Sequence, residues 1–387
     1  MRVGIVIDDV DRRRGGMSEW CWQFVNSAAA RKHALHVIAQ GFGEDLLPTD
    51  VVQHRLPQAG SRVAFAQAAS SAIRDLKLDV VHDMGLGLDF DIFQPHGGSY
   101  AAWLGRRLDM YPAWIRGIKR SIDAWLPRQR DFAQHGQMQT AALARGQSQV
   151  IAISNMVAES FTRLQGVRPD RIEVIYNGVD CSRYSPAHRA QLRAVARRKL
   201  GLADETVLLL LAAHNFRLKG VPELLATARR LLANGRPVHV AIAGGKRLAK
   251  WRHFANRLGL AGRVSFLGTV ADMIPLYAAA DAYVHPTYYD PCSLVLLEAA
   301  ASGLPIITTR RFNGAAELFR EGEEILTIND PTDGDALYER ADAVFDERIR
   351  EALGAAARQV ALRNPIERNI ANIVALYGDR SRRQLAA

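Results

Sequence analysis

Two acidic residues, Asp290 and Glu298, lie eight positions apart within the stretch HPTYYDPCSLVLLEAAASGLPIITT. Ser293 is a typical N-cap, and the apolar residues that follow it predict a buried helix over 294–301. Glu298 would then be an acid within an apolar element, where a charge needs partners. Asp290 lies in the turn that leads into the helix. This arrangement of two acids suits hydrogen bonds to the hydroxyl groups of a sugar.

The elements around this stretch indicate how the two acids are positioned. Apolar, strand-like runs alternate with helical segments along the whole chain, beginning with the strand over 3–7. This alternation predicts an α/β fold with parallel sheets. Ligands of such folds bind at the carboxyl ends of the strands. We therefore expect the chemistry to lie in loops that follow strands.

Two cations occupy one of these loops. Arg217 and Lys219 follow the strand predicted over 207–211 and precede a helix that begins near Pro222. An arginine fork and a lysine point charge at a helix entrance suit a diphosphate group. Gly244 follows the next predicted strand, 238–243, and allows the backbone to approach a ligand closely.

Arginines and glycines also follow the first strand of the chain. Gly15 and Gly16 lie at a strand-to-helix junction, where the backbone can approach an anion. Arg12, Arg13 and Arg14 precede them and have two interpretations. They form either a solvated basic loop or a site that binds the phosphate of an acceptor substrate.

The segment 103–130 combines aromatic and basic residues. It holds three of the six tryptophans, Trp103, Trp114 and Trp125, and seven Arg or Lys residues against two acids. From 113 to 126 the spacing predicts an amphipathic helix with Trp114, Ile118 and Trp125 on the apolar face and Lys119 and Arg120 opposite. Such a helix either packs on its own domain or lies in the plane of an anionic membrane surface, and the tryptophans and cations favour the membrane.

Composition restricts the classes of protein to consider. The chain has 387 residues, enough for two or three domains, and a formal net charge of +10, which indicates an anionic partner. Its three widely spaced cysteines favour reduced thiols in the cytoplasm. No apolar run approaches the roughly 20 residues that span a bilayer. We expect a protein that is soluble or bound to a membrane surface.

The stretch that contains Asp290 and Glu298 resembles the E-x7-E signature of the retaining family 4 glycosyltransferases. The resemblance implies the GT-B fold, in which two Rossmann-like domains with parallel sheets face each other across a cleft. It implies that Glu298 binds the ribose of a nucleotide-sugar donor and that Asp290 binds the sugar. Asp290 is shorter than the usual Glu and leaves the identity of that sugar open. In such families the residues after the first acid donate backbone N–H groups to the donor; here they are Pro291, Cys292, Ser293 and Leu294, of which Pro291 has no N–H to donate.

The resemblance also implies roles for other loops. Gly15 and Gly16 match the glycine loop that faces the diphosphate and the acceptor, and the loop of Gly244 lies near the base. Lys219 and Arg217 would stabilise the leaving diphosphate, although the usual arginine position holds His214 here. His96 matches a histidine near the donor sugar, with His82 and Asp83 as the other candidates. Because the cations can replace a metal ion, we expect no metal and no cofactor.

Across most of its length the sequence resembles the lipopolysaccharide-core glucosyltransferases. These are peripheral enzymes of the inner face of the cytoplasmic membrane, and they contact it through a segment like 103–130. The resemblance implies transfer of glucose from UDP-glucose to a lipid-linked glycan, with retention. The expected domains are 1–178 for the acceptor and membrane, 179–364 for the nucleotide sugar, and a C-terminal segment 365–387. Its helix, expected over about 365–377, crosses back onto the first domain.

Three alternatives remain. The first is the same chemistry on a capsule or other glycan precursor, and the second is a sugar-nucleotide epimerase of the same fold. The third is a basic module that binds nucleic acid. The chain lacks the aromatic and basic strand pattern of such modules, so we expect no nucleic-acid partner.

Overall fold

The computed structural model describes residues 1–12, 15–44 and 47–385, which form two compact units. Unit 1 comprises Met1–Tyr176 and the segment from Glu367 onward, and unit 2 comprises Asn177–Ile366. The chain therefore passes between the units twice, at 176–177 and at 366–367. Both units have the Rossmann-like architecture that the GT-B fold requires, and each is described separately.

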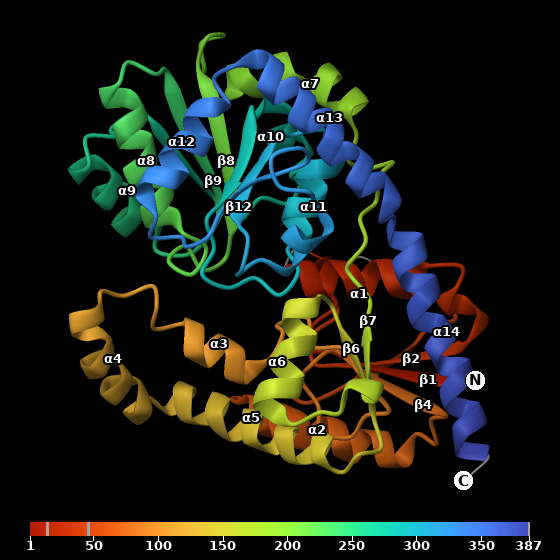
Figure 1. The fold of residues 1–387 in the computed structure, drawn as a ribbon. Coiled ribbons are helices and arrows are strands. Elements are labelled where there is room, and N and C mark those ends of the chain that lie inside the picture. The colour runs from red at the N-terminus through yellow and green to blue at the C-terminus, as the bar shows by residue number, and fades with distance from the viewer. Residues whose placement is uncertain (13–14, 45–46, 386–387) are drawn as a thin grey trace. The chain divides into compact units, whose positions relative to one another are not determined.

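Among the described residues, unit 1 is built on seven parallel strands in the spatial order β3-β2-β1-β4-β5-β6-β7 (Figure 1). Val3, Ile5 and Val6 of β1 are fully buried, as expected for a central strand of a sheet covered on both faces. The strands are β1 (Arg2–Val6), β2 (Ala34–Ala39), β3 (Val52–Arg55), β4 (Val80–Asp83), β5 (Ile92–Phe93), β6 (Gln149–Ala152) and β7 (Ile172–Val174).

The helices of unit 1 include the last helix of the chain, which packs against the first. Trp20 Nε1 in α1 donates a hydrogen bond to Oδ1 of Asn369 in α14, at 2.9 Å. The sequence predicts that this last helix ends near Tyr377, but the structure continues it to Leu385. The α-helices are α1 (Gly16–Asn26), α2 (Arg62–Asp75), α3 (Tyr100–Arg106), α4 (Ala113–Trp125), α5 (Pro127–Ala144), α6 (Asn155–Gln165) and α14 (Ile366–Leu385).

Unit 2 has a six-stranded parallel sheet in the order β10-β9-β8-β11-β12-β13. Its central strands are buried on both faces, and β8 and β11 lie side by side. The strands are β8 (Val207–Ala213), β9 (Val238–Gly244), β10 (Val264–Gly268), β11 (Ala282–His285), β12 (Ile306–Thr309) and β13 (Leu326–Ile328). The α-helices are α7 (Pro186–Lys199), α8 (Val221–Ala233), α9 (Leu248–Arg257), α10 (Ile274–Ala279), α11 (Leu294–Ala301), α12 (Gly334–Ala343) and α13 (Glu347–Arg363).

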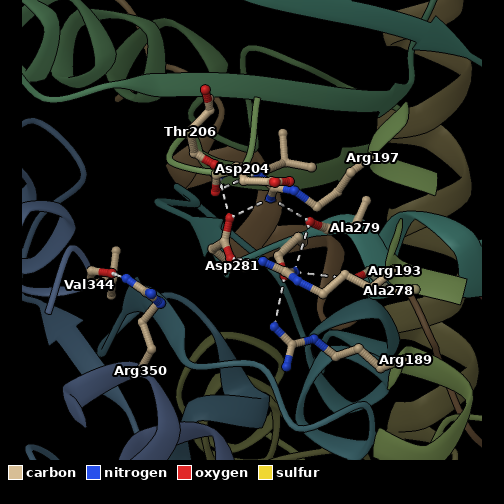
Figure 2. Close-up of polar contacts among 12 residues, drawn as sticks. Arg189, Arg193, Arg197, Asp204, Thr206, Ala278, Ala279, Asp281, Val344 and Arg350 are labelled. Carbon is tan, nitrogen blue, oxygen red and sulfur yellow. Dashed lines mark hydrogen bonds and ion pairs between the residues drawn. The ribbon is translucent and has the colours of Figure 1, made fainter. Parts of the chain in front are cut away.

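An arginine cluster on α7 fixes the start of β11 (Figure 2). Arg193 and Arg197 bind the carboxylate of Asp281 at 2.5 and 3.0 Å, and Arg193 also donates to the last carbonyls of α10. The same carboxylate accepts a hydrogen bond from the backbone N–H of Leu208 in β8, at 2.8 Å. Asp281 therefore joins α7 to two neighbouring strands. One of them, β11, ends at His285 and leads into the loop that carries Asp290.

Candidate functional site

The ion pair between Lys219 and Asp290 links two loops of unit 2. Lys219 lies in the loop before α8, and its Nζ is 2.7 Å from Oδ2 of Asp290. The same ammonium donates to the carbonyl of Tyr289 at 3.0 Å. The two charged side chains are 18% and 12% exposed, so each charge depends on the other for compensation. The structure thus brings together the predicted cation and the predicted first acid.

His285 also lies near Asp290. The ring is completely buried, and its Nε2 is 3.7 Å from Oδ2 of Asp290. Burial lowers the pKa of His285 to about 3, so the ring is neutral at neutral pH. The backbone of Asp290 is held by two hydrogen bonds, from its N–H to Phe312 O at 2.7 Å and from Gly314 N to its carbonyl at 2.9 Å. The position of the carboxylate is therefore set from the main chain.

The second acid, Glu298, lies in α11 and is half-buried. Its Oε2 accepts a hydrogen bond from the hydroxyl of Tyr277 at 2.7 Å. Burial, and then the charge of Glu298, raise the pKa of Tyr277 well above its usual range, so the proton stays on the phenol. Tyr283 lies near both acids: burial raises its pKa most, and the charges of Asp290 and Glu298 raise it further.

The loop before α11 presents backbone N–H groups. The hydroxyl of Ser293 caps the helix by accepting from Leu296 N at 3.4 Å. In the part of the chain that the structure describes, the backbone N–H groups of Ser293 and Leu294 have no acceptor. Cys292 is buried, and burial raises the pKa of its thiol, so the thiol is not a nucleophile. Amides at a helix N-terminus favour an anion, which suits the role expected of residues 292–294.

Gly244 and Gly245 end β9 in a conformation that requires glycine. Their φ angles are +88° and +76°. A Cβ atom on Gly244 would lie 2.3 Å from the carbonyl oxygen of Ala213, and one on Gly245 would lie 2.2 Å from the ring of Phe216. The two residues therefore let the loop after β9, which is the predicted base-binding loop, pass close to the end of β8.

Arg217 lies in the same loop as Lys219 but has a different neighbour. Its charge acts on Glu223, whose pKa is raised by burial and lowered in part by Tyr288 and Arg217. His214, at the usual arginine position, is close to Lys219. Its pKa is lowered by partial burial, and then by Lys246 and Lys219. The ring is therefore neutral and cannot replace the missing guanidinium.

In unit 1, the glycine loop leads into α1. Gly16 is the first residue of the helix, and Gly15 precedes it with φ +140°. Arg12 binds Glu19 through two hydrogen bonds of 2.7 and 3.0 Å, and its guanidinium lies 3.9 Å from the ring of Trp22. Arg12 is therefore already engaged by a carboxylate. Arg13 and Arg14 lie outside the described residues.

The two candidate histidines of unit 1 lie together with Trp20. The ring of His96 is 4.8 Å from that of Trp20. His82, at the end of β4, is bonded through Nδ1 to the hydroxyl of Tyr377 at 2.7 Å. Burial lowers the pKa of His82 to about 3, with a further contribution from His96, and lowers the pKa of His96 to about 4. Asp83, the third candidate, binds the backbone N–H groups of Gly85, Leu86 and Gly87, so it organises its own loop.

The apolar face of α4 is exposed. Trp114 is 80% exposed, Trp125 75%, Ile118 61% and Ile122 52%. Large apolar side chains this accessible are unusual on one helix of a soluble domain and indicate an interaction surface. None of the described helices is long and apolar enough to span a bilayer.

Two residues predicted to belong to this surface have partners within unit 1. Trp103, in α3, stacks on Phe132 of α5, with ring centroids 5.7 Å apart. Lys119 forms an ion pair with Asp123, which also binds Arg107. Arg120 is exposed. Of the predicted surface, Trp114, Ile118, Arg120 and Trp125 keep an outward position.

The sequence did not identify several residues of these sites. Tyr277, His285 and Asn177 contact the loop and helix of the two acids, and Trp20 contacts His96. A histidine at the end of a buried strand and an aromatic residue after a glycine loop are detectable signals. The residue that each of them contacts cannot be detected from the sequence, because it comes from a distant segment. Over the described ranges, no group of three or more potential metal ligands is found.

Comparisons with protein families cover both units. Residues 193–360 match the model "Glycosyl transferases group 1", and residues 14–183 match "Glycosyltransferase Family 4". The D-inositol 3-phosphate glycosyltransferase of Geodermatophilus obscurus is 31% identical over 396 aligned residues, covering 94% of this chain and 84% of that protein. The lipopolysaccharide glucosyltransferase WaaG of Escherichia coli is 28% identical over 182 residues. That match covers 46% of this chain and 48% of WaaG, and other such relatives are likewise matched over about half of their length.

Two solved structures share the fold. The crystal structure of WaaG superposes with a TM-score of 0.82 at 20% identity, covering 97% of this chain and 99% of that one. Anabaena HepE, solved in complex with UDP and glucose, superposes with a TM-score of 0.70 at 21% identity, covering 97% and 98%. These likenesses establish the two-domain GT-B fold.

Proposed function

Because this chain belongs to the family 4 glycosyltransferases and has the GT-B fold, we propose that it transfers a hexose, specifically glucose from UDP-glucose, with retention of the anomeric centre. The observation that supports this best is the Lys219–Asp290 pair next to the N-terminus of α11. It places a cation, a carboxylate and uncommitted backbone amides on neighbouring loops of unit 2. UDP and glucose are the ligands of HepE, which has the same fold.

The donor's diphosphate would be bound by Lys219 and by the backbone N–H groups of residues 292–294. An ammonium has three N–H groups. Two of those of Lys219 donate to the carbonyl of Tyr289 and to the carboxylate of Asp290, and the third can donate to a phosphate oxygen. A lysine fixed in advance by a carboxylate is a preorganised donor, which stabilises the charge that develops as the diphosphate leaves. Arg217, in the same loop, adds positive charge.

The two acids would hold the sugar and the ribose. Glu298, oriented by Tyr277, would accept hydrogen bonds from the ribose hydroxyls, and Asp290 would accept from hydroxyls of the hexose. No residue is needed as a covalent nucleophile in this proposal. A phosphate oxygen of the leaving group takes the proton of the acceptor hydroxyl on the same face of the sugar. The role of His96 towards the donor sugar stays a prediction.

We propose a lipid-linked glycan, such as the lipopolysaccharide core, as the acceptor. Support comes from the likeness to WaaG and from the exposed apolar face of α4. Tryptophan favours the membrane interface, and each cation near an anionic surface contributes roughly 1 kcal/mol. In this proposal α4 lies on the inner face of the cytoplasmic membrane.

A second acceptor class is a phosphorylated polyol. The relative matched over 94% of this chain is a D-inositol 3-phosphate glycosyltransferase, and arginine forks bind phosphate well. The bidentate contact of Arg12 with Glu19 argues against Arg12 in that role, because the guanidinium would have to leave its carboxylate.

The decisive experiment measures donor consumption and transfer with UDP-glucose, UDP-galactose, UDP-GlcNAc and GDP-mannose. Acceptors are heptose-containing lipopolysaccharide core and D-inositol 3-phosphate. We expect UDP-glucose and the core to give product with a retained anomeric configuration by NMR. Release of UDP that needs no acceptor would favour an epimerase, and no consumption of any donor would refute the proposed donor class.

Glu298→Ala tests the site, and Glu323→Ala, an exposed acid of unit 2, is the matched control. We expect the first variant to lose donor binding and the second to keep it. Full turnover by Glu298→Ala would show that the donor site is assigned to the wrong residues.

A further inference from the structure

Asn177 holds the loop between the two acids from a distant part of the chain. Its Nδ2 donates a hydrogen bond to the backbone carbonyl of Cys292 at 2.9 Å. Asn177 is only 2% exposed, and its Oδ1 is buried with no partner among the described residues. A buried oxygen without a partner is unfavourable, so a purely space-filling role would be better served by an apolar residue. The contact with Cys292 is therefore the feature that requires an amide.

The geometry of the peptide bond carries this contact to the next residue. The carbonyl of Cys292 and the N–H of Ser293 belong to one peptide unit, which is planar and trans. In a trans peptide these two groups point in opposite directions. Because Asn177 engages the carbonyl from one side, the N–H of Ser293 is directed to the other side. That N–H has no acceptor in the described parts of the chain.

Asn177 is itself fixed by its neighbours. Val179 N donates to the carbonyl of Asn364 at 3.1 Å, and Ile366 N donates to the carbonyl of Val179 at 3.1 Å. A Cβ atom on Gly178 would lie 2.6 Å from Cα of Ile366, so the two segments touch backbone to backbone. Both passages of the chain out of unit 2 are thus bonded together beside Asn177. They give the amide a rigid base.

We propose that Asn177 is a positioning residue for the donor: by holding the Cys292 carbonyl, it points the Ser293 N–H at the diphosphate. The inference rests on the proposed function, because it needs a nucleoside diphosphate in unit 2. Without the amide, the peptide between Cys292 and Ser293 can rotate, and the donor loses one charge-assisted hydrogen bond. The nucleoside part of the ligand keeps its own contacts.

The test compares UDP with uridine, which lacks the phosphates. Affinities of wild type, Asn177→Ala and Asn26→Ala are measured by calorimetry for UDP and by competition NMR for uridine. Asn26 is the matched control, because its Nδ2 also donates to a backbone carbonyl, that of Trp22 in α1, at 2.8 Å. We expect Asn177→Ala to lose about tenfold or more in UDP affinity with little change for uridine. Asn26→Ala should change neither the UDP affinity nor the uridine affinity.

A second variant keeps the shape of the side chain and adds a pH readout. In Asn177→Asp, the ionised carboxylate cannot donate to a carbonyl, whereas the protonated acid can. Burial raises the pKa of the new acid, so the UDP affinity of this variant should improve relative to the wild type as the pH is lowered. Circular dichroism confirms that each variant is folded.

The outcomes separate the two proposals. If the wild type binds UDP and Asn177→Ala binds it equally well, or loses UDP and uridine alike, the positioning role is refuted while the proposed function stands. If the wild type does not bind UDP, the proposed donor fails first, and this role fails with it.

Discussion

The Nζ atom of Lys219 lies 2.7 Å from Oδ2 of Asp290, across 71 positions of sequence. The two residues follow β8 and β11, which are neighbours in a parallel sheet. Carboxyl ends of neighbouring parallel strands meet at one edge of the sheet, so their loops can bring opposite charges together. This contact is the basis of the proposed donor site.

Replacing Lys219 by Ala should lower turnover by about 10²–10³-fold, because the departing diphosphate loses a preorganised cation. The loss should persist at saturating donor, since the charge develops in the transition state. Steady-state kinetics with the nucleotide sugar that the enzyme accepts measures kcat and KM. Lys250→Ala, an exposed lysine of α9, is the control and should be unaffected. A normal turnover number for Lys219→Ala would contradict the role.

The buried histidines predict that the protein loses stability in acid. Burial lowers the pKa of His82 and of His285 to about 3, whereas in the unfolded chain each titrates near 6.5. Between pH 6.5 and pH 3 the unfolded chain binds more protons than the folded protein. The free energy of unfolding is therefore highest above pH 6.5 and decreases as the pH falls. At pH 5 the loss is about 2 kcal/mol per ring.

Urea unfolding at pH 7.5, 6 and 5 measures this loss. His82→Gln removes one titrating ring and should flatten the pH dependence. His253→Gln changes an exposed ring of α9 and should leave the dependence as in the wild type. Equal slopes for the wild type and His82→Gln would show that His82 does not stay neutral in the folded state.

Asp281→Asn should destabilise unit 2 by about 3–5 kcal/mol, because it leaves Arg193 and Arg197 without their counter-charge at a largely buried position. Chemical denaturation measures the change. Asp335→Asn is the control: its partner Arg230 and Asp335 itself are exposed, so the expected change is below about 1 kcal/mol. A similar small effect for both variants would mean that the cluster does not anchor β11.

Trp114→Ser and Trp125→Ser should each weaken binding to vesicles of anionic phospholipid about tenfold, because each removes a large apolar side chain from the proposed membrane face. Sedimentation with vesicles measures binding, and donor hydrolysis in solution should stay unchanged. Ile349→Ser, an exposed apolar residue of α13, is the control. Unaltered sedimentation of both tryptophan variants would place the membrane contact elsewhere or exclude it.

The sequence predicts much of the fold because the relevant signals are local. Alternating apolar strands and helices identify parallel α/β units, and the amphipathic spacing over 113–126 locates α4 almost to its ends. The N-cap at Ser293 predicts the start of α11 correctly. The length of α14 was underestimated, because its last turns are polar and carry no apolar period.

The candidate site is less accessible from sequence, because partners come from distant segments. The sequence allows Arg12 either a solvated basic loop or a phosphate-binding site, and the structure pairs it with Glu19. Trp103 was grouped with the membrane face, and it stacks on Phe132. In both cases the residue type was informative, but the competing partner within the protein could not be read from spacing.

By itself, the sequence determined the family, the two-domain parallel architecture and the pair of acids at positions 290 and 298, because these depend on short-range pattern and residue type. The tertiary structure decided which groups contact those acids and their loop. Lys219 pairs with Asp290, Tyr277 donates a hydrogen bond to Glu298, and Asn177 donates one to the loop between the two acids. Such contacts depend on how strands and helices pack, and packing joins residues whose separation along the chain carries no signal.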